Sequence, residues 1–359
     1  MSLKENSYQV IIGNSILHTL KNEIEKNNLN RNIMVVADEN VMKYHPKEIK
    51  QILNGSTGKI NYYPLKPGET SKSFVQLNKI YSFLLNRGYG RDALIIGIGG
   101  GVTGDLVGYA ASTFMRGVQL IHVPTTLLAA VDSAIGGKTG INFEKKKNMI
   151  GSFYQPRLVV IDTNFFKSLP KREQTSGIGE IIKYGYLSDK AFFNFLNDNI
   201  GMIYNFDREI IDEVIKQCVS IKASVVSKDE KESGIRKILN LGHTFAHGFE
   251  TDLNFKIKHG EAVIAGIISA LYLSENLGIL GHAKLEELLS LPKKIKMPEF
   301  FRNFSVKNVM EIMKHDKKNK NGKIKFVLPS DVGNLLLDIE AKDSIIKDSL
   351  LKMKKDLNY

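Results

Sequence analysis

Short, continuously apolar runs alternate with helical patterns in the first half of the chain, and this alternation most constrains how the sequence can fold. The runs NIMVVAD (residues 32–38) and ALIIGIG (residues 93–99) have the length and composition of buried parallel strands. Between them, residues 73–88 repeat apolar side chains with helical spacing and end at Gly88. VQLIHVP and RLVVID, further along, resemble the first two runs. Because parallel strands are joined by crossovers, the pattern predicts a doubly wound α/β domain with a mostly parallel sheet.

Beyond Pro170 the character of the sequence changes. Segments of helical period dominate residues 171–315, and only KIKFVLP, later in the chain, has the composition of a strand. A chain of 359 residues is long enough for two domains. We therefore predict an α/β domain over residues 1–165 and a mainly α-helical domain over residues 166–359.

The net charge of +12 raises nucleic acid as a partner, but the pattern of charges argues against it. The densest lysine groups lie far apart, without the interleaved aromatic residues of a base-stacking surface, and small anionic ligands explain some of them. The longest apolar run, residues 262–273, is too short to cross a bilayer and predicts a buried helix. Cys218 is the single cysteine, and the polar start MSLKENSYQV has no leader pattern. We expect a cytoplasmic protein that binds neither nucleic acid nor membranes.

A glycine-rich loop, IIGIGGGVTGD (residues 95–105), follows one predicted strand and precedes a helical pattern. Gly99, Gly101 and Gly104 fit G-x-G-x-x-G, in which glycines let the backbone approach a pyrophosphate at a helix N-terminus. The alternative is a structural turn that needs positive φ. The acidic residue expected about 20 residues downstream is missing. Asp38, at the end of an earlier strand, could hold a ribose instead, which predicts a dinucleotide site of non-standard topology.

Three histidines cluster in the second half of the chain. His243 and His247 are four residues apart, and His259 follows in a His-Gly-Glu triplet. Spacing alone predicts that the three imidazoles bind Zn²⁺ with one position open, although hydrogen bonding in a core or acid–base chemistry is the alternative. Glu180 and Lys183 lie one helical turn apart in an apolar stretch, where Glu180 is either a further metal ligand or half of an intrahelical ion pair.

The stretch VDSAIGGKTGINFEKKKNMIG (residues 131–151) carries Asp132, Lys138, Lys147 and Asn148 among glycines and small residues. Such a loop predicts polar groups that converge on an anion. The alternative, a basic surface loop, suits Lys146 and its neighbours better than Lys138, which follows two glycines.

The chain resembles the sugar-phosphate cyclases, and among them the family of 3-dehydroquinate synthases, in segments that occur in the family's order between residues 64 and 329. The segments are GGGVTGD, VPTTLLAAVDSAIGGKTGIN, KKNMIGSFYQP, LPKREQTSGIGEIIKYG, DEKESGIRKILNLGHTFAHGFE and KHGEAV. Gly179 and Lys146 stand where alanine and glycine are commoner in the family, and neither departure removes a functional group.

The resemblance changes the predicted metal ligands. It implies that Glu180, His243 and His259 bind Zn²⁺ or Co²⁺, and that His247 is a catalytic residue rather than a ligand. One carboxylate and two imidazoles with an open position suit either ion.

The resemblance also assigns residues to NAD and to the substrate. It implies that NAD binds the first domain at a set of strand-end and loop residues: Asp38, Asn40, Glu69, Lys72, Gly101, Val102, Thr103, Gly104, Asp105, Thr125, Thr126, Lys138 and Lys147. It implies that the second domain holds the metal and that the substrate contacts a largely cationic and amide set: Asp132, Lys138, Asn148, Lys183, Lys222, Arg236, Asn240 and, beside both ligands, Lys147. Arg116 matches an arginine that reaches a phosphate across a homodimer interface, and Lys317 or Lys318 matches another phosphate contact.

The activity implied by the resemblance is a phosphate-eliminating carbon–oxygen lyase reaction. The family converts 3-deoxy-D-arabino-heptulosonate 7-phosphate to 3-dehydroquinate and phosphate, an early step toward chorismate in the shikimate pathway and hence toward the aromatic amino acids. Transient NAD-dependent oxidation, β-elimination, reduction and aldol closure make up the reaction. Two alternatives are a sister cyclase that acts on another sugar phosphate and a metal-dependent polyol-phosphate dehydrogenase. The dense set of anion-binding residues and the His-Gly-Glu triplet argue against the dehydrogenase.

Overall fold

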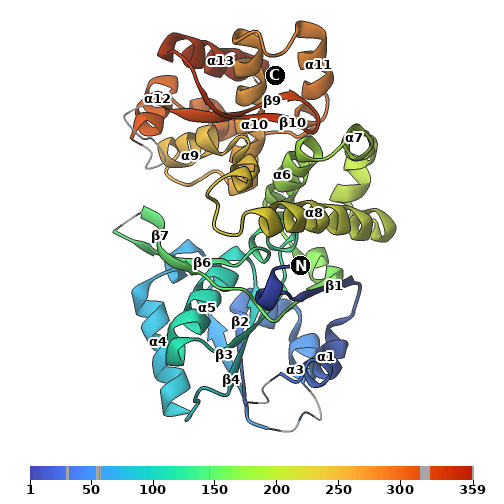
Figure 1. Cartoon of the computed structure of the whole chain (residues 1–359), viewed down its shortest axis with the longest axis vertical. Coiled ribbons are helices and arrows are strands. Elements are labelled where there is room, and N and C mark those ends of the chain that lie inside the picture. Colours follow the sequence, from blue (N-terminus) through green and yellow to red (C-terminus); the bar gives the residue numbers. More distant parts are fainter. Residues whose placement is uncertain (30–31, 54–55, 57, 145, 316–323, 358–359) are drawn as a thin grey trace. The chain divides into compact units, whose positions relative to one another are not determined.

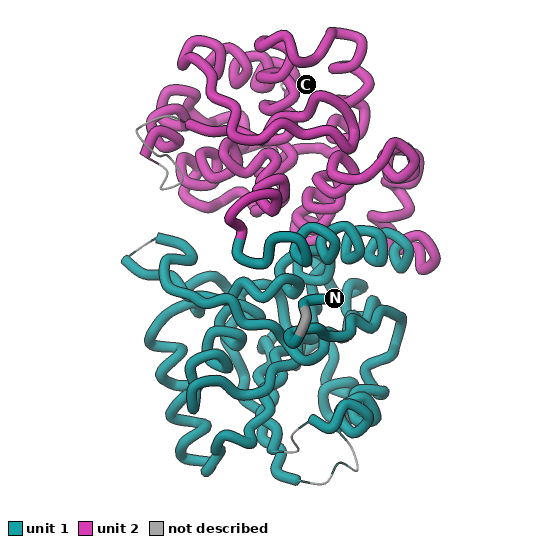
Figure 2. The backbone as a smooth tube through the Cα atoms, in the orientation of Figure 1, with its two compact units in different colours: residues 1–170, 211–231 teal, residues 171–210, 232–359 magenta. Residues whose placement is uncertain are grey.

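The computed structural model describes residues 1–29, 32–53, 56, 58–144, 146–315 and 324–357, and the chain divides into two compact units (Figure 2). Unit 1 contains residues 1–170 and 211–231, and unit 2 contains residues 171–210 and 232–359. The predicted boundary near residue 165 does not account for residues 211–231, which come later in the chain but belong to unit 1. One contact within unit 1 is made by Lys222, whose ammonium donates from helix α8 (Arg208–Lys228) to the backbone oxygen and to the carboxylate of Asp132, at 2.8 Å each.

Unit 1 is built on a six-stranded sheet in the order β1-β8-β5-β4-β2-β3, in which all the neighbouring strands are parallel. The strands are β1 (Gln9–Gly13), β2 (Asn32–Asp38), β3 (Ile60–Leu65), β4 (Ala93–Gly99), β5 (Gln119–Pro124) and β8 (Leu158–Asp162). All the residues of β4 and of β8 are buried, as continuous apolar runs in a parallel sheet require. The prediction of a doubly wound α/β domain is confirmed.

Helices cover both sides of this sheet: α1 (Leu20–Lys26), α2 (Glu39–Tyr44), α3 (Pro46–Gln51), α4 (Phe74–Asn86) and α5 (Gly101–Thr113). Figure 1 shows α4 and α5 on one side and α1 and α3 on the other. Leu77, Ile80 and Leu84 of α4 pack with apolar residues of α5, β2 and β4 into one buried cluster. Their three- and four-residue spacing is the signal that predicted α4.

A two-stranded hairpin, β6 (Lys138–Phe143) and β7 (Lys146–Phe153), occupies much of the stretch expected to be an anion-binding loop. The strands approach so closely that a Cβ on Gly151 would lie 2.1 Å from the backbone oxygen of Thr139. Glycine therefore serves strand pairing at this position.

His122 is a buried imidazole inside unit 1, in the middle of β5. Its ring occupies space left by glycines, because a Cβ on Gly97 would lie 3.6 Å from its Nδ1, and Cβ atoms on Gly104 and Gly108 would lie 3.9 and 3.7 Å from its Cε1. Nδ1 has no hydrogen-bond partner among the described residues. Burial lowers the pKa of His122 to about 4, because the imidazolium would lose its hydration.

We expect this histidine to make unit 1 less stable in acid. At pH 8 the imidazole is neutral in the folded and unfolded chain, whereas near pH 5 the unfolded chain binds a proton that the folded chain does not. The free energy of unfolding should therefore fall as the pH drops from 6.5 toward 4, by up to about 3 kcal/mol from this group. Denaturant titrations of wild type and His122→Gln across this range measure the effect. Curves that run parallel for the two proteins would show that His122 does not cause it.

Unit 2 is mainly helical and is organised around helix α10 (His259–Asn276), which packs against α6 (Lys171–Leu187), α9 (His243–Asp252) and α13 (Asp343–Asp356). All the residues of α10 from Gly260 to Ser274 are buried, which confirms the helix predicted over residues 262–273. Unit 2 also contains the α-helices α7 (Lys190–Tyr204), α11 (His282–Leu289) and α12 (Val306–Lys314). No helix in the described parts of the chain has the length and apolar character that a membrane span needs.

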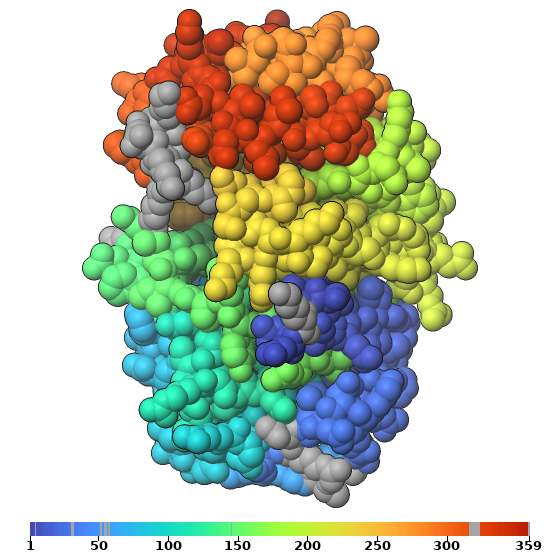
Figure 3. Space-filling model, in the orientation of Figure 1, coloured from blue at the N-terminus to red at the C-terminus, as the bar shows by residue number. Residues whose placement is uncertain are grey.

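Two antiparallel strands, β9 (Lys325–Asp331) and β10 (Asn334–Glu340), complete unit 2. The sequence predicted β9 but not β10, which alternates exposed and half-buried residues. Figure 3 shows this part of the chain in red-orange on the surface of unit 2. Its sequence, NLLLDIE, does not alternate apolar and polar residues with this burial, because Leu336 lies at an exposed position, and so the pattern does not indicate a strand.

Candidate cofactor and metal sites

The residues predicted to bind NAD follow the carboxyl ends of neighbouring strands in unit 1. Asp38 ends β2, Glu69 follows β3, the glycine loop follows β4, and Thr125 and Thr126 follow β5. Ala37 pairs with Ile98 in the parallel register, so Asp38 ends its strand beside the start of the glycine loop. Asp38 also accepts a hydrogen bond from the backbone of Asn40 at 2.8 Å and so caps α2. Ligands of doubly wound sheets bind at this edge. Asp38, which comes from a strand earlier in the chain, can therefore lie where the usual dinucleotide motif has an acid downstream of the glycine loop.

The glycine loop leads directly into α5, which begins at Gly101. Side chains are excluded here, because a Cβ on Gly99 would lie 2.3 Å from Thr103 Oγ1 and a Cβ on Gly100 would lie 2.9 Å from Thr126 Cγ2. Thr103 Oγ1 is buried and has no partner among the described residues. Bare backbone amides at the first turn of a 13-residue helix can bind a pyrophosphate.

A buried lysine connects three of the predicted residues. Lys72 is 4% exposed, donates to Asp105 at 2.6 Å and also donates to the side chain of Asn148 on the hairpin. Burial raises the pKa of Asp105, although Lys72 opposes the shift. Glu69 joins the same cluster through Asn142, whose amide donates to the Glu69 carboxylate at 2.8 Å. The hairpin therefore brings Asn148 to α5 and to the residues after β3.

The remaining predicted residues of unit 1 lie on helices, on the hairpin strands and in a turn. Lys222 pairs with Asp132, as described above, while Lys138 and Lys147 are exposed on the hairpin strands. Arg116 is exposed in a tight turn in which Met115 and Arg116 both have positive φ, 50° and 67°. Two successive non-glycine residues in this region store backbone strain, which is a common feature of functional turns.

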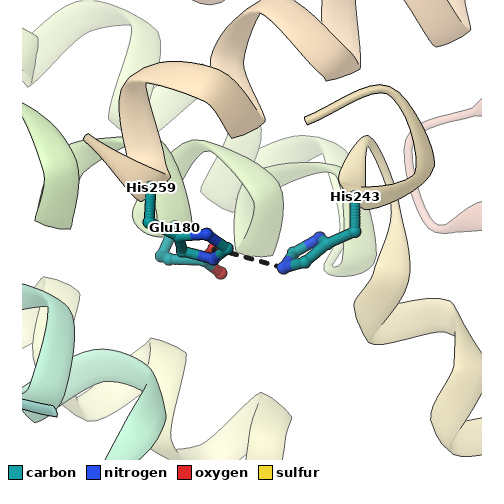
Figure 4. Close-up of side chains that lie close together, drawn as sticks. All are labelled: Glu180, His243 and His259. Carbon is teal, nitrogen blue, oxygen red and sulfur yellow. Dashed lines mark ion pairs between the residues drawn. The ribbon is translucent and has the colours of Figure 1, made fainter. Parts of the chain in front are cut away.

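Unit 2 brings together Glu180, His243 and His259, whose ligand atoms all lie within 4.8 Å of one another (Figure 4). The Nε2 atoms of His259 and His243 lie 3.3 and 3.6 Å from Glu180 Oε1. Each histidine is the first residue of its helix, α10 and α9, and Glu180 lies within α6. Among the described residues, this is the one group of three or more such side chains close enough to hold an ion.

Charge in this group is arranged around a fully buried carboxylate. Glu180 is 0% exposed and pairs with Lys183 one turn along α6, so the ion pair that was one of the two interpretations of Glu180 is present. Burial lowers the pKa of His243 well below its ordinary value. Burial would also lower the pKa of His259, but its hydrogen bonds to Glu180 and Glu250 raise it to about 10. The buried carboxylate of Glu180 thus lies beside positive charge on Lys183 and raises the pKa of His259, and a divalent cation would supply positive charge at the same place.

Glycines lie where α10 contacts α6 and the start of α9. A Cβ on Gly260 would lie 1.8 Å from the backbone oxygen of Ser176 in α6, and a Cβ on Gly179 would lie 2.1 Å from that of Gly260. A Cβ on Gly266 would lie 2.1 Å from the backbone oxygen of Gly242, which has a φ of +77°. Alanine at position 179, the commoner residue in the family, would not permit so close an approach of α6 to α10.

His247, Arg236 and Asn240 also belong to unit 2. The His247 ring lies one turn after His243, with its centroid 6.0 Å away, and it is not among the three side chains that converge. Arg236 is 1% exposed, and the Asn240 amide donates to Glu232 at 2.8 Å. The predicted phosphate contact at Lys317 lies outside the described residues.

Sequence reasoning missed Glu250, which is 5% exposed and whose Oε1 lies 3.5 Å from His259 Nδ1. A signal for it exists, since Glu250 comes seven residues after His243 on α9 and so lies on the same helical face.

Solved structures with this fold include cyclases and dehydrogenases. The 2-epi-5-epi-valiolone synthase of Streptomyces hygroscopicus subsp. jinggangensis, with NAD⁺ and Zn²⁺ bound, is 24% identical, with 99% of each chain covered and a TM-score of 0.87. A 2-deoxy-scyllo-inosose synthase complexed with carbaglucose-6-phosphate, NAD⁺ and Co²⁺ is 23% identical, with 96% of each chain covered and a TM-score of 0.84. Glycerol dehydrogenase from Schizosaccharomyces pombe, at 19% identity, covers 97% of this chain and 89% of its own, with a TM-score of 0.67. The chain therefore shares the fold of these two synthases and of this dehydrogenase.

Sequence comparison identifies the family within this class. Models of the 3-dehydroquinate synthase N-terminal and C-terminal regions match residues 62–176 and 177–319. The 3-dehydroquinate synthase of Alkaliphilus metalliredigens is 42% identical over 336 residues, 93% of each chain. That of Pelagibacter ubique is 41% identical over 366 aligned residues, 99% of this chain and 98% of its own. The chain belongs to the 3-dehydroquinate synthase family.

Proposed function

We propose that this protein converts 3-deoxy-D-arabino-heptulosonate 7-phosphate to 3-dehydroquinate and phosphate, using NAD and a divalent metal ion. The observation that carries the proposal is the 42% identity, over 93% of each chain, to a curated 3-dehydroquinate synthase. Its place in metabolism is the shikimate pathway toward chorismate. Its single cysteine, Cys218, is buried and cannot form a disulfide within the chain, which supports a cytoplasmic setting that cell fractionation can test.

The residues of unit 1 suit a dinucleotide. Gly99 and Gly100 leave the backbone bare at the start of α5, and Asp38 stands beside them at the end of the neighbouring strand. We propose that backbone amides from Gly101 to Asp105, with the Thr103 hydroxyl, hold the pyrophosphate. Lys72 is already held by Asp105 and Asn148, so it would orient the cofactor without having to be ordered on binding.

The donors in unit 2 suit Zn²⁺ or Co²⁺. One carboxylate and two imidazoles are the ligand types that these ions take, and three protein ligands leave a position open. His243 Nδ1 lies 3.1 Å from the backbone oxygen of Leu241, which can only accept, so His243 presents the lone pair of Nε2 toward Glu180. When bound, NAD supplies reversible hydride transfer, and the metal ion supplies Lewis acidity at the hydroxyl group that is oxidised.

The other predicted residues bind and orient an anionic, flexible substrate. Arg236 would receive the carboxylate, because its planar guanidinium can make two parallel hydrogen bonds. Lys138, Lys147, Arg116 and Lys317 would neutralise phosphate, while Asp132, Lys183, Lys222, Asn148 and Asn240 would position hydroxyl groups. His247 lies one turn from His243 and is half-buried, so it can hold and return a proton beside the metal ligands. Fixing one substrate through several steps is a task of orientation, which explains the number of polar groups.

The test separates a cyclase from a dehydrogenase by following phosphate and reduced nicotinamide together. Supplied with the heptulosonate phosphate in large excess over NAD⁺, the protein should release one phosphate per product over many turnovers, with no lasting rise in NADH absorbance. The reason is that the oxidation serves only to acidify the neighbouring carbon, and the same hydride must return before product forms. A hexose phosphate without a carboxylate serves as the control substrate.

Two outcomes would contradict the proposal. NADH that accumulates in step with product would identify a dehydrogenase. Phosphate release from the control substrate, with none from the heptulosonate phosphate, would identify a sister cyclase.

We also propose that the protein is a homodimer in which Arg116 reaches the phosphate site of the partner subunit. The strained turn at Met115 and Arg116 supports this, since it holds an exposed arginine at the end of α5 in a costly backbone conformation. A monomeric mass by light scattering in an active preparation would show this part of the proposal to be wrong.

A further inference from the structure

The two imidazoles at the predicted metal site differ in what their outer nitrogens contact. His243 Nδ1 lies 3.1 Å from the neutral backbone oxygen of Leu241. His259 Nδ1 lies 3.5 Å from Oε1 of Glu250, a carboxylate. In both rings Nε2 is the atom that lies toward Glu180. An acceptor at Nδ1 fixes the hydrogen on that nitrogen and leaves the lone pair of Nε2 for a ligand bond.

Glu250 reaches His259 from a different helix. It lies in α9, seven residues after His243, and His259 begins α10 after an intervening loop. The backbone of that loop returns to the same residue, because Phe255 N donates to the Glu250 carbonyl at 2.7 Å. Glu250 therefore connects the helix that carries one predicted ligand to the start of the helix that carries another.

Glu250 is a buried carboxylate beside His259. It is 5% exposed, and a carboxylate at such a position needs charged or polar neighbours, of which the His259 ring is one. Asp252, two residues further along α9, lies away from the histidines: its oxygens accept hydrogen bonds from Ser305 N and Asn308 Nδ2, at 2.8 and 3.0 Å, and stabilise the start of α12.

We propose that Glu250 is a positioning residue that orients His259 for metal binding. This inference rests on the proposed function, because it requires that Glu180, His243 and His259 bind an ion. The carboxylate holds the hydrogen of His259 on Nδ1, fixes the plane of the ring and makes Nε2 a stronger donor. The backbone oxygen of Leu241 likewise holds a hydrogen on Nδ1 of His243 and fixes the plane of that ring, but it adds no charge.

The experiment measures metal affinity in the full-length protein, independently of activity. Protein freed of metal with a chelator is titrated with Co²⁺ and with Zn²⁺ in competition with a chromophoric chelator, and thermal unfolding of the metal-free protein is recorded alongside. Glu250→Ala should weaken binding of both ions about 10- to 100-fold. Glu250→Gln keeps an oxygen that can accept from Nδ1 but loses the charge, so its affinity should lie between those of wild type and Glu250→Ala. Asp252→Ala, the matched control, should lower the melting temperature and leave affinity unchanged.

Each outcome has a separate meaning. Wild-type affinity in a folded Glu250→Ala protein would overturn the inference, and so would an equal loss of affinity in Asp252→Ala. If Glu250→Ala does not fold, the isosteric Glu250→Gln decides: wild-type affinity in that variant overturns the inference, and a loss of affinity at an unchanged melting temperature supports it. If the wild-type protein itself binds neither ion, the proposed metal site is wrong. If the wild-type protein and the Glu250 variants bind the ions equally well, the metal site stands and only the role of Glu250 is wrong.

Discussion

Replacing His259 with alanine is expected to strip the metal ion from the protein, whereas His247→Ala should keep the ion and lose activity. Spacing alone pairs His243 with His247, but His259 Nε2 lies 3.3 Å from Glu180, and the His247 ring centroid lies 6.0 Å from that of His243. Removing one of three protein ligands leaves two, too few for a catalytic Zn²⁺ site. Removing an acid–base residue costs about 10²- to 10⁴-fold in rate without touching the ion.

Metal content after dialysis and turnover of the heptulosonate phosphate, measured on the same preparations, test this expectation. His282→Ala is the control, since His282 is exposed and pairs with Glu275 on the surface of unit 2. Metal retained by His259→Ala and lost from His247→Ala would reverse the roles assigned to these two histidines.

Gly260→Ala is expected to destabilise unit 2 and weaken metal binding together. Its Cβ would lie 1.8 Å from the backbone oxygen of Ser176, and backbone cannot give way as the end of a flexible side chain can. The two helices must separate, at a cost of about 3 kcal/mol or more, and the separation moves His259 away from Glu180. The free energy of unfolding and the Co²⁺ affinity measure the two consequences.

Gly201→Ala offers a matched control in the same unit. Gly201 lies inside α7 and has open space around it, so alanine there should raise helix propensity and stabilise the protein by up to about 1 kcal/mol. The same chemical change should therefore have opposite signs at two helical positions. If Gly260→Ala unfolds at the same denaturant concentration as Gly201→Ala, contact of α6 with α10 does not govern the site.

The parts of the fold that sequence predicted are those whose residues are buried on both faces. β2, β4, β5, β8 and most of α10 are continuous apolar runs, and the apolar spacing in α4 matches its buried face. β1 and β3 lie at the edges of the sheet and are mostly half-buried, so they carry no such run. The hairpin strand β7 is largely exposed and holds two lysines, an asparagine and a glycine, which indicate a loop when strand pairing is unknown.

For the candidate sites, local spacing predicted which residue types matter but not which of them meet. His243 and His259 were found from sequence, but Glu180 comes from α6, and no periodicity shows that α6 crosses α10 at glycines. The residues alone left Glu180 open as either a metal ligand or half of an ion pair, and the resemblance to the family selected it as a ligand. In unit 1, the order of parallel strands places Asp38 beside the glycine loop, and strand order is not encoded in any short segment.

The return of residues 211–231 to unit 1 has a consequence for synthesis on the ribosome. Unit 1 begins the chain, yet its last segment is made only after α6 and α7 of unit 2 have been translated. Until Lys222 emerges, Asp132 lacks the ammonium that bonds both its carboxylate and its backbone oxygen. Neither unit corresponds to one continuous stretch of the gene, so recombination at a single point cannot exchange one without dividing the other.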